Sequence, residues 1–103
     1  MAKIKIRARA KGDMALVKTL MRHPMETGLR KDKKTGKKIP AHYITEVKCE
    51  HNGQLAMTAY LGPAVSKNPY MAFEVKGAKA GDKVKISWVD NQGERASAEA
   101  VIK

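Results

Sequence analysis

The dipeptide Asn52-Gly53 limits the possible folds more than any other feature of this sequence, because it joins two segments in which apolar and polar residues alternate. Both residues accept a positive φ, as the central positions of a two-residue hairpin loop require. The sequence therefore predicts a β-hairpin over residues 45–60. The side chains expected on its inner face are Val47, Cys49 and His51 in the first strand, and Leu55, Met57, Ala59 and Leu61 in and after the second.

The same alternation recurs along most of the chain. It predicts further strands over residues 3–10, 14–21, 70–75, 83–88 and 95–102, with turns between them. About seven short strands without a helix indicate an all-β fold, an immunoglobulin-like antiparallel β-sandwich with Trp88 at its centre. We expect one domain over residues 1–103, since this length suffices for a single core. Hydrophobic residues make up 43% of the chain, which excludes a disordered tail.

Two strands leave their inner face open. In residues 14–21 the inward set is either Ala15, Val17, Thr19 and Met21 or Met14, Leu16 and Leu20, and a helix is an alternative because this segment contains good helix formers. In the last strand the inward set is either Ala96, Ala98, Ala100 and Ile102 or the offset pair Ser97 and Val101. In the first strand, Ile4, Ile6, Ala8 and Ala10 face the core and cations face outward.

Residues 23–40 break the pattern with Gly, Pro and many lysines. A connection this long in a small domain is more often functional than idle. Within it, Met25 stands beside Pro24, where we expect an exposed thioether suited to a protein contact. In the later loop, Pro69 is expected to bias Asn68 toward an extended conformation.

Candidate chemistry in the sequence is sparse. Cys49, His51 and Met57 are the ligand types of blue-copper sites, but a mid-chain cysteine does not match the ligand spacing of such proteins. Catalysis by the thiol of Cys49 would need an accessible, electropositive setting, whereas the alternation points this residue inward. No Ser-His-Asp or paired-acid pattern stands out. We therefore expect no enzyme activity, no catalytic residue, no cofactor and no metal site.

The formal net charge of +11 and the pI near 10.0 indicate an anionic partner without choosing one. A basic β-sandwich that binds nucleic acid is the alternative function, because the lysines after Arg30 could follow a phosphate backbone. Readers of single strands need exposed aromatic side chains, and only Tyr43, Tyr60 and Tyr70 remain outside the expected core. An acidic protein surface would use the same charge.

The loops resemble those of the SoxZ family, the small non-catalytic subunit of the sulfur-carrier heterodimer in the thiosulfate-oxidising (Sox) system. The resemblance runs from about Gly12 to Val101. The segments that carry it are HPMETGLRKD at 23–32, GKKIP at 36–40, CEHNG at 49–53, PAVSKNPY at 63–70 with Phe73, and WVD at 88–90 with Gly93.

This resemblance implies a non-catalytic sandwich that binds a SoxY-type carrier chain and presents it to other Sox enzymes. In that family the partner carries the loaded cysteine on a Gly-Gly-Cys-Gly-Gly tail, so Cys49 is expected to be structural. The resemblance also implies export to the periplasm with a signal-bearing partner, and we expect the isolated subunit to form homo-oligomers through its docking surface. The residues expected to face the partner or to shape the loops are Met25, Gly28, Arg30, Pro40, Asn68, Pro69 and Tyr70.

Overall fold

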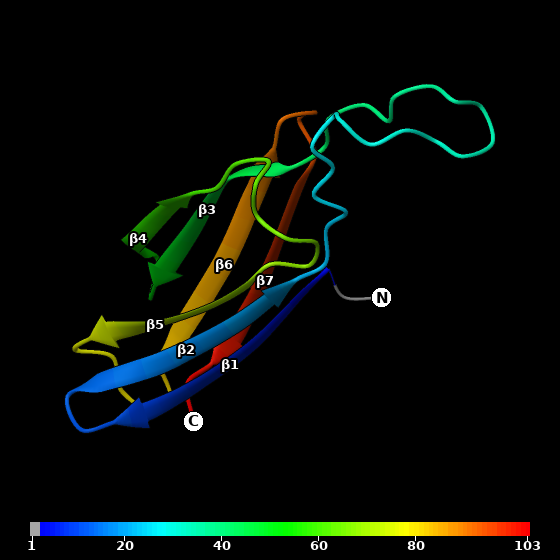
Figure 1. Cartoon of the computed structure of the whole chain (residues 1–103). Helices are drawn as coiled ribbons and strands as arrows, with labels where there is room; N and C mark the ends of the chain where they lie inside the picture. Colours follow the sequence, from blue (N-terminus) through cyan, green and yellow to red (C-terminus); the bar gives the residue numbers. More distant parts are fainter. Residues whose placement is uncertain (1–2) are drawn as a thin grey trace.

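Seven β-strands and no helix make up the structure, a computed structural model that describes residues 3–103 (Figure 1). The strands are β1 (Ile4–Lys11), β2 (Met14–Met21), β3 (Ile44–His51), β4 (Gln54–Tyr60), β5 (Tyr70–Lys76), β6 (Lys83–Asp90) and β7 (Arg95–Val101). All the strands expected from the alternation are present, and residues 14–21 form a strand and not a helix. Within the described part of the chain, no helix is long and apolar enough to cross a membrane.

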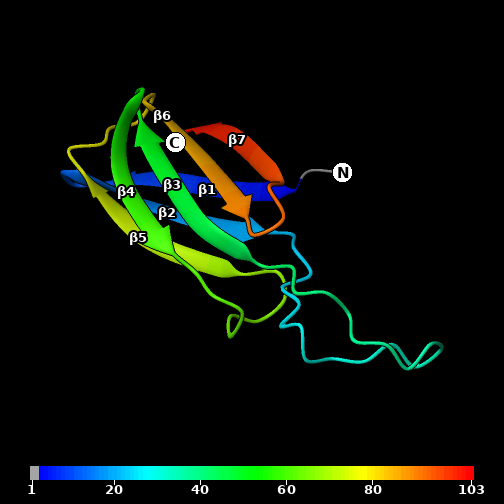
Figure 2. The same cartoon turned by 90° about the horizontal axis from the view of Figure 1, so that it is seen from above.

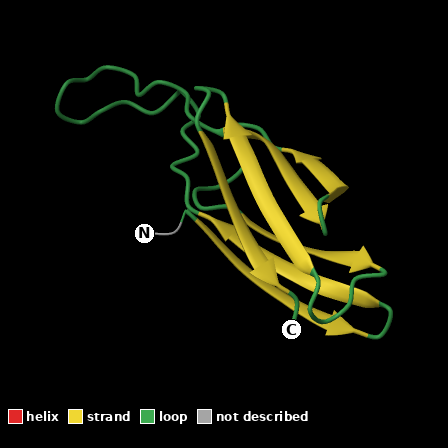
Figure 3. Ribbon diagram, turned by 180° about the vertical axis from the view of Figure 1, so that it is seen from behind, coloured by secondary structure: helices red, strands yellow, loops and turns green. Residues whose placement is uncertain are grey.

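The strands form two antiparallel sheets that face each other. One sheet has the order β1-β2-β5 and the other the order β4-β3-β6-β7. Figure 2 shows the two layers from above, and Figure 3 shows that loops and turns make the connections. Strands far apart in sequence are therefore neighbours in each sheet, as in the predicted immunoglobulin-like sandwich, which is confirmed.

The core lies between the sheets and settles the two open faces. In β2 the buried set is Ala15, Val17, Thr19 and Met21, and at β7 the alanines and Ile102 face inward. Trp88 is 3% exposed, and the ring of His23 packs edge-on against it with 5.1 Å between ring centroids. Aromatic rings favour such edge-to-face contacts, so this contact links the core to the loop that follows β2.

The central hairpin has the predicted turn. Asn52 and Gly53 adopt φ values of 49° and 85°, so both central positions are positive as expected. The prediction that Leu55 shares the inner face with Met57 is wrong, because Leu55 is 59% exposed. The register shifts between Cys49 and Glu50, so that Met57 stands opposite Cys49 but Leu55 stands opposite Glu50. The extra residue of this bulge turns Leu55 to the outer face.

Candidate functional site

The loops at one end of the sandwich bring the seven predicted site residues into one region. The connections from β2 to β3, from β4 to β5 and from β6 to β7 meet at this end (Figure 1). We call the region the loop platform and define it as residues 22–43, 61–70 and 90–94. Hydrogen bonds join its three segments to one another.

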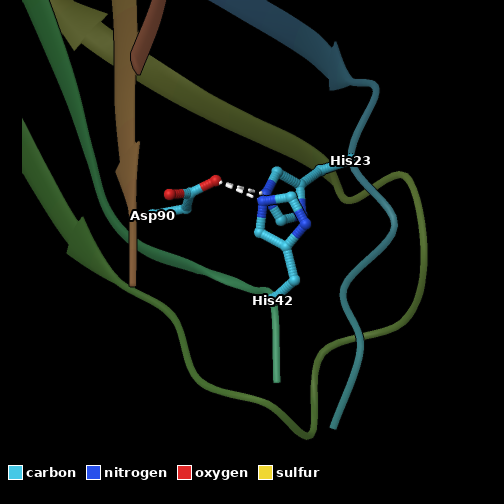
Figure 4. A group of neighbouring side chains, drawn as sticks. All are labelled: His23, His42 and Asp90. Atoms are coloured by element: carbon cyan, nitrogen blue, oxygen red, sulfur yellow. Dashed lines mark hydrogen bonds and ion pairs between the residues drawn. The ribbon is translucent and has the colours of Figure 1, made fainter. Parts of the chain in front are cut away.

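Asp90, the last residue of β6, is the centre of the loop platform (Figure 4). Its Oδ2 accepts hydrogen bonds from His23 Nε2 at 3.0 Å and from His42 Nε2 at 2.7 Å. Its Oδ1 accepts the backbone N–H groups of Gln92 at 3.0 Å and Glu94 at 2.8 Å. A carboxylate has about four acceptor sites, so this buried group is fully satisfied.

The same bonds decide the charge of Asp90. Burial raises the pKa of its carboxyl group, but hydrogen bonds from His23, Glu94, His42 and Gln92 stabilise the ionised form. The bonds outweigh burial, so the pKa of Asp90 lies below its ordinary value. An anion is thus held inside the end of the sandwich between two imidazole rings. The carboxylate of Glu94 approaches His42 Nε2 to 3.4 Å from the more exposed side.

The ligand atoms of His23, His42 and Asp90 lie close enough together to surround a metal ion. The hydrogen bonds argue against such a site. The N–H of Met25 donates to His23 Nδ1 at 3.1 Å, so the hydrogen of the neutral His23 ring is on Nε2 and points at Asp90. His42 Nε2 also faces the carboxylate and must donate to it. Neither nitrogen offers a lone pair there, whereas a metal-bound histidine donates through its other nitrogen.

Asn68 and Pro69 join the second loop to the first. The Oδ1 of Asn68 accepts the N–H of His23 at 3.0 Å, and the N–H of Asn68 donates to the His23 carbonyl at 3.0 Å. The prediction of an extended Asn68 is wrong, because its φ is 54°. Asparagine tolerates this left-handed region, and the two bonds to His23 offset the conformational cost. Pro69 is buried, and its carbonyl accepts the N–H of Met21.

Met25 is a core residue, so the expectation of an exposed thioether is wrong. It is 5% exposed, and its Sδ accepts the N–H of Ile44 at 3.3 Å. The φ of Met25 is 49°, which is unusual for a residue with a side chain. In this conformation the N–H of Met25 meets the ring of His23 while the side chain enters the core. Met25 therefore shapes the loop from inside.

Gly28 marks the point where the two arms of the β2–β3 connection approach each other. Its φ is 87°, and an added Cβ would lie 3.2 Å from the Cβ of Ala41. Nearby, the guanidinium of Arg30 donates two hydrogen bonds to the carboxylate of Glu26, one of them from Nε at 3.1 Å. These bonds lower the pKa of Glu26 and raise the pKa of Arg30. Pro40 is exposed on the returning arm.

Beyond Gly28 the chain continues as a narrow two-stranded ribbon. We call residues 30–39 the basic ribbon. The N–H of Ile39 donates to the Arg30 carbonyl at 2.7 Å, and the N–H of Asp32 donates to the Lys37 carbonyl at 2.8 Å. Figure 1 shows the basic ribbon in cyan and green, extending away from both sheets. Its exposed lysines are therefore presented at a distance from the sandwich, and the longest dimension of the molecule is 53 Å.

Tyr70 begins β5 at the border of the loop platform. It is 60% exposed and lies opposite Leu20 of β2, on the outer face of the three-stranded sheet. Among the predicted site residues, Arg30, Pro40, Asn68 and Tyr70 are thus exposed, Gly28 is half-buried, and Met25 and Pro69 are buried. Partner binding by these residues stays a prediction.

Sequence reasoning missed the residues that hold the loop platform together. His23 and His42 each adjoin a proline or a turn, and Asp90 ends a strand, which are ordinary positions for such residues. Asp90 is 67 residues from His23 and 48 residues from His42. The fold brings them together, and local spacing carries no signal of it.

The residues considered for copper or thiol chemistry have other roles. Cys49 is fully buried, and burial, together with the nearby charge of Glu50, raises the pKa of its thiol to about 11. The thiol therefore stays protonated near neutral pH, which is unfavourable for a nucleophile or a metal ligand. His51 lies at the other end of β6, where its Nε2 contacts Asp82 Oδ2 at 2.8 Å.

Comparison with known proteins places the chain in a family. No curated protein matches it significantly. The sequence profile described as "Sulphur oxidation protein SoxZ" matches residues 4–101, from the first residue of β1 to the last residue of β7. The matched region includes every strand and the whole loop platform, and the match agrees with the resemblance of the loop segments. The chain therefore belongs to the SoxZ family and has a role in the sulfur-oxidising Sox system.

Proposed function

We propose that this protein is a non-catalytic subunit that binds a SoxY-type sulfur-carrier chain and presents it to the other Sox enzymes. The reactive sulfur is then attached to a cysteine of the carrier, and this chain contributes shape and charge. The proposal extends to location: the subunit reaches the periplasm together with its partner.

The main support is the way the loop platform uses its polar groups. The buried carboxylate of Asp90 accepts bonds from two imidazole rings and two backbone N–H groups. His23 Nδ1 is occupied by the N–H of Met25. These contacts hold loops in place and do not prepare an acid or a base for a substrate. A rigid loop arrangement suits recognition of another protein, because less conformational entropy is lost on binding.

The only cysteine supports the same proposal. Its side chain has no exposed surface, and its thiol has a pKa of about 11. A sulfur carrier needs an accessible thiolate that successive enzymes can reach. Cys49 does not meet this requirement, so the carrier thiol is expected on a partner.

Charge supports a partner that is acidic. The chain carries a net charge of +11, and the exposed lysines of the basic ribbon extend part of this charge away from the sandwich. Complementary charge raises the rate of encounter and helps to select among partners. Acidic residues are therefore expected on the carrier surface that meets the loop platform.

Co-expression with a carrier chain that ends in Gly-Gly-Cys-Gly-Gly tests the proposal. The two chains are expected to purify together and to elute as a heterodimer in size-exclusion chromatography. After incubation with thiosulfate and the other Sox enzymes, mass spectrometry should find adducts on the carrier cysteine and none on Cys49. Separate monomers at micromolar concentration, or adducts on Cys49, would contradict the proposal. Binding of an oligonucleotide by the isolated chain in dilute buffer would favour the nucleic-acid alternative.

A further inference from the structure

The edge strands of the two sheets differ in their charge. β5 and β7 each carry one cation and one acid, and β1 carries the cations Lys5, Arg7, Arg9 and Lys11. β4 has the sequence QLAMTAY and carries no charge, although 30% of the whole chain is charged. Charges on an edge strand keep its unpaired backbone groups from pairing with another chain. β4 is thus the edge strand without charged residues, and its bulge at Ala56 leaves residues 57–60 as the regular part of the open edge.

The two sides of the sandwich are also closed differently. Beside β1 and β7, the N–H of Ala10 donates to the Lys103 carbonyl at 2.8 Å, and the N–H of Lys103 donates to the Ala8 carbonyl at 3.0 Å. On the opposite side β4 and β5 are the edges, and within residues 3–103 no backbone hydrogen bond joins them. Figure 2 shows β4 and β5 as the margins of the two layers on this side. The sandwich is therefore open along β4.

Apolar side chains gather along this open side. Leu55 and Tyr60, near the two ends of β4, are 59% and 78% exposed. Val75 of β5 is buried, but the other inward residues of the two edge strands are only half-buried against the core, and they are Met57 and Ala59 of β4 and Met71 and Phe73 of β5. Covering this surface would remove apolar area from water, which favours association.

We propose that β4 pairs with an extended strand of the carrier chain, which adds a fifth strand to the four-stranded sheet. In an antiparallel pair beyond the bulge at Ala56, alternate residues of β4 bond to β3, so the residues between them direct their N–H and C=O groups to the open side. An extended strand satisfies such groups in series. The inference rests on the proposed function, because it names the place where the carrier binds.

Charge and continuity favour the carrier over a second copy of this chain. Two copies would bring net charges of +11 against each other, whereas an acidic carrier is attracted. β4 ends at Tyr60, and Leu61 already belongs to the loop platform. A partner seated on the loop platform therefore reaches β4 without crossing another element. The strand that pairs with β4 is expected to be apolar on the side that covers Met57.

A charge placed on β4 tests the inference in the complex. Ala56→Glu introduces an acid at an exposed position of β4, and Ser97→Glu does the same on β7, the other edge strand of that sheet. Ala56→Glu is expected to weaken the affinity for the carrier at least about tenfold, while Ser97→Glu, which changes the net charge equally, changes the affinity far less. Equal affinities for both variants and the wild type would overturn the inference and leave the proposed function standing. No binding by the wild type would remove both.

Hydrogen exchange in the unmutated complex gives an independent measurement. Amides of residues 54–60 that point to the open side are expected to exchange more slowly when the carrier is bound, and those of residues 95–101 are expected to keep their rates. Protection confined to other strands would contradict pairing at β4. A wild-type chain that dimerises alone, and that Ala56→Glu makes monomeric, would show that a second copy occupies the edge.

Discussion

The two ends of β6 carry the same chemical pair in different environments. Asp82 stands just before β6 and accepts a bond from His51 Nε2 at 2.8 Å, whereas Asp90 ends β6 and accepts from His23 and His42. The side chain of Asp90 is fully buried, while that of Asp82 is 24% exposed. Burial therefore separates two carboxylates that are otherwise alike.

The comparison shows what a buried carboxylate adds to a loop region. Asp82 accepts hydrogen bonds from the Lys79 N–H and from His51, and so connects the turn at Lys79 to the β3–β4 hairpin. Solvent can replace either of these partners. Solvent has little access to Asp90, whose four bonds hold the connections around β2, β3 and β6. Removing the acceptor of a buried hydrogen-bond donor costs more stability than removing that of an exposed donor, because water cannot reach the buried donor to replace the lost bond. The hydrogen bonds of Asp90 thus hold several loops together, whereas those of Asp82 connect one turn to one hairpin.

Replacing each aspartate by alanine tests most directly whether Asp90 contributes more stability than Asp82. Asp90→Ala leaves the buried ring of His23 and neighbouring donors without an acceptor and should lower the free energy of unfolding by about 3 kcal/mol. Asp82→Ala should lower it by clearly less, because water reaches the freed groups. Urea unfolding of the two variants beside the wild type measures both changes. Equal losses would show that burial does not distinguish the two ends.

The strands could be predicted because each depends on neighbours in the sequence. Val84, Ile86 and Trp88 alternate with polar residues, and the two sheets need only this period to bury them. Asn52-Gly53 likewise announces its turn through backbone preferences of the two residues. Such local signals account for the seven strands and for the sandwich.

The failures have long-range causes. Leu55 turns outward because of a bulge opposite Glu50, and Asn68 leaves the extended region because His23, 45 residues away, binds both its N–H and its Oδ1. Met25 is buried because its Sδ accepts the N–H of Ile44 and its own N–H donates to the ring of His23. Each outcome depends on contacts that exist only after the sheets have formed.

Gly28 and Gly36 differ in the space around them, which allows a second comparison within the β2–β3 connection. Both have positive φ, but a Cβ at Gly28 would press on Ala41, while a Cβ at Gly36 meets open space. Gly28→Ala is expected to lower stability by about 2 kcal/mol and Gly36→Ala by about 1 kcal/mol, since only the first adds a close contact to the backbone strain. Thermal unfolding of both variants measures the difference. Identical melting temperatures would mean that the structure tolerates a Cβ at Gly28 as well as one at Gly36.

The half-buried carboxylate of Asp82 is expected to make the free energy of unfolding depend on pH. Hydrogen bonds from His51 and the Lys79 N–H lower the pKa of Asp82 from 3.8 to about 2. A lowered pKa means that its stabilising contribution is complete above about pH 4 and is lost as the pH falls toward 2. The stability difference between the wild type and Asp82→Asn should therefore be constant near neutral pH and vanish toward pH 2. Urea unfolding across this range tests it, and a difference that grows in acid would contradict it.

Arg30 is expected to give the smallest change in stability. Its side chain is 65% exposed, and its pair with Glu26 lies at the surface, where ion pairs contribute little. Arg30→Ala should leave the melting temperature unchanged within error, and Lys34→Ala, which alters an exposed cation near the tip of the same ribbon, serves as its control. In the proposed complex with the carrier, Arg30→Ala is expected to weaken binding a few-fold, because Glu26 no longer positions a cation at the base of the basic ribbon. A large loss of stability instead would assign Arg30 to the framework that Asp90 supports.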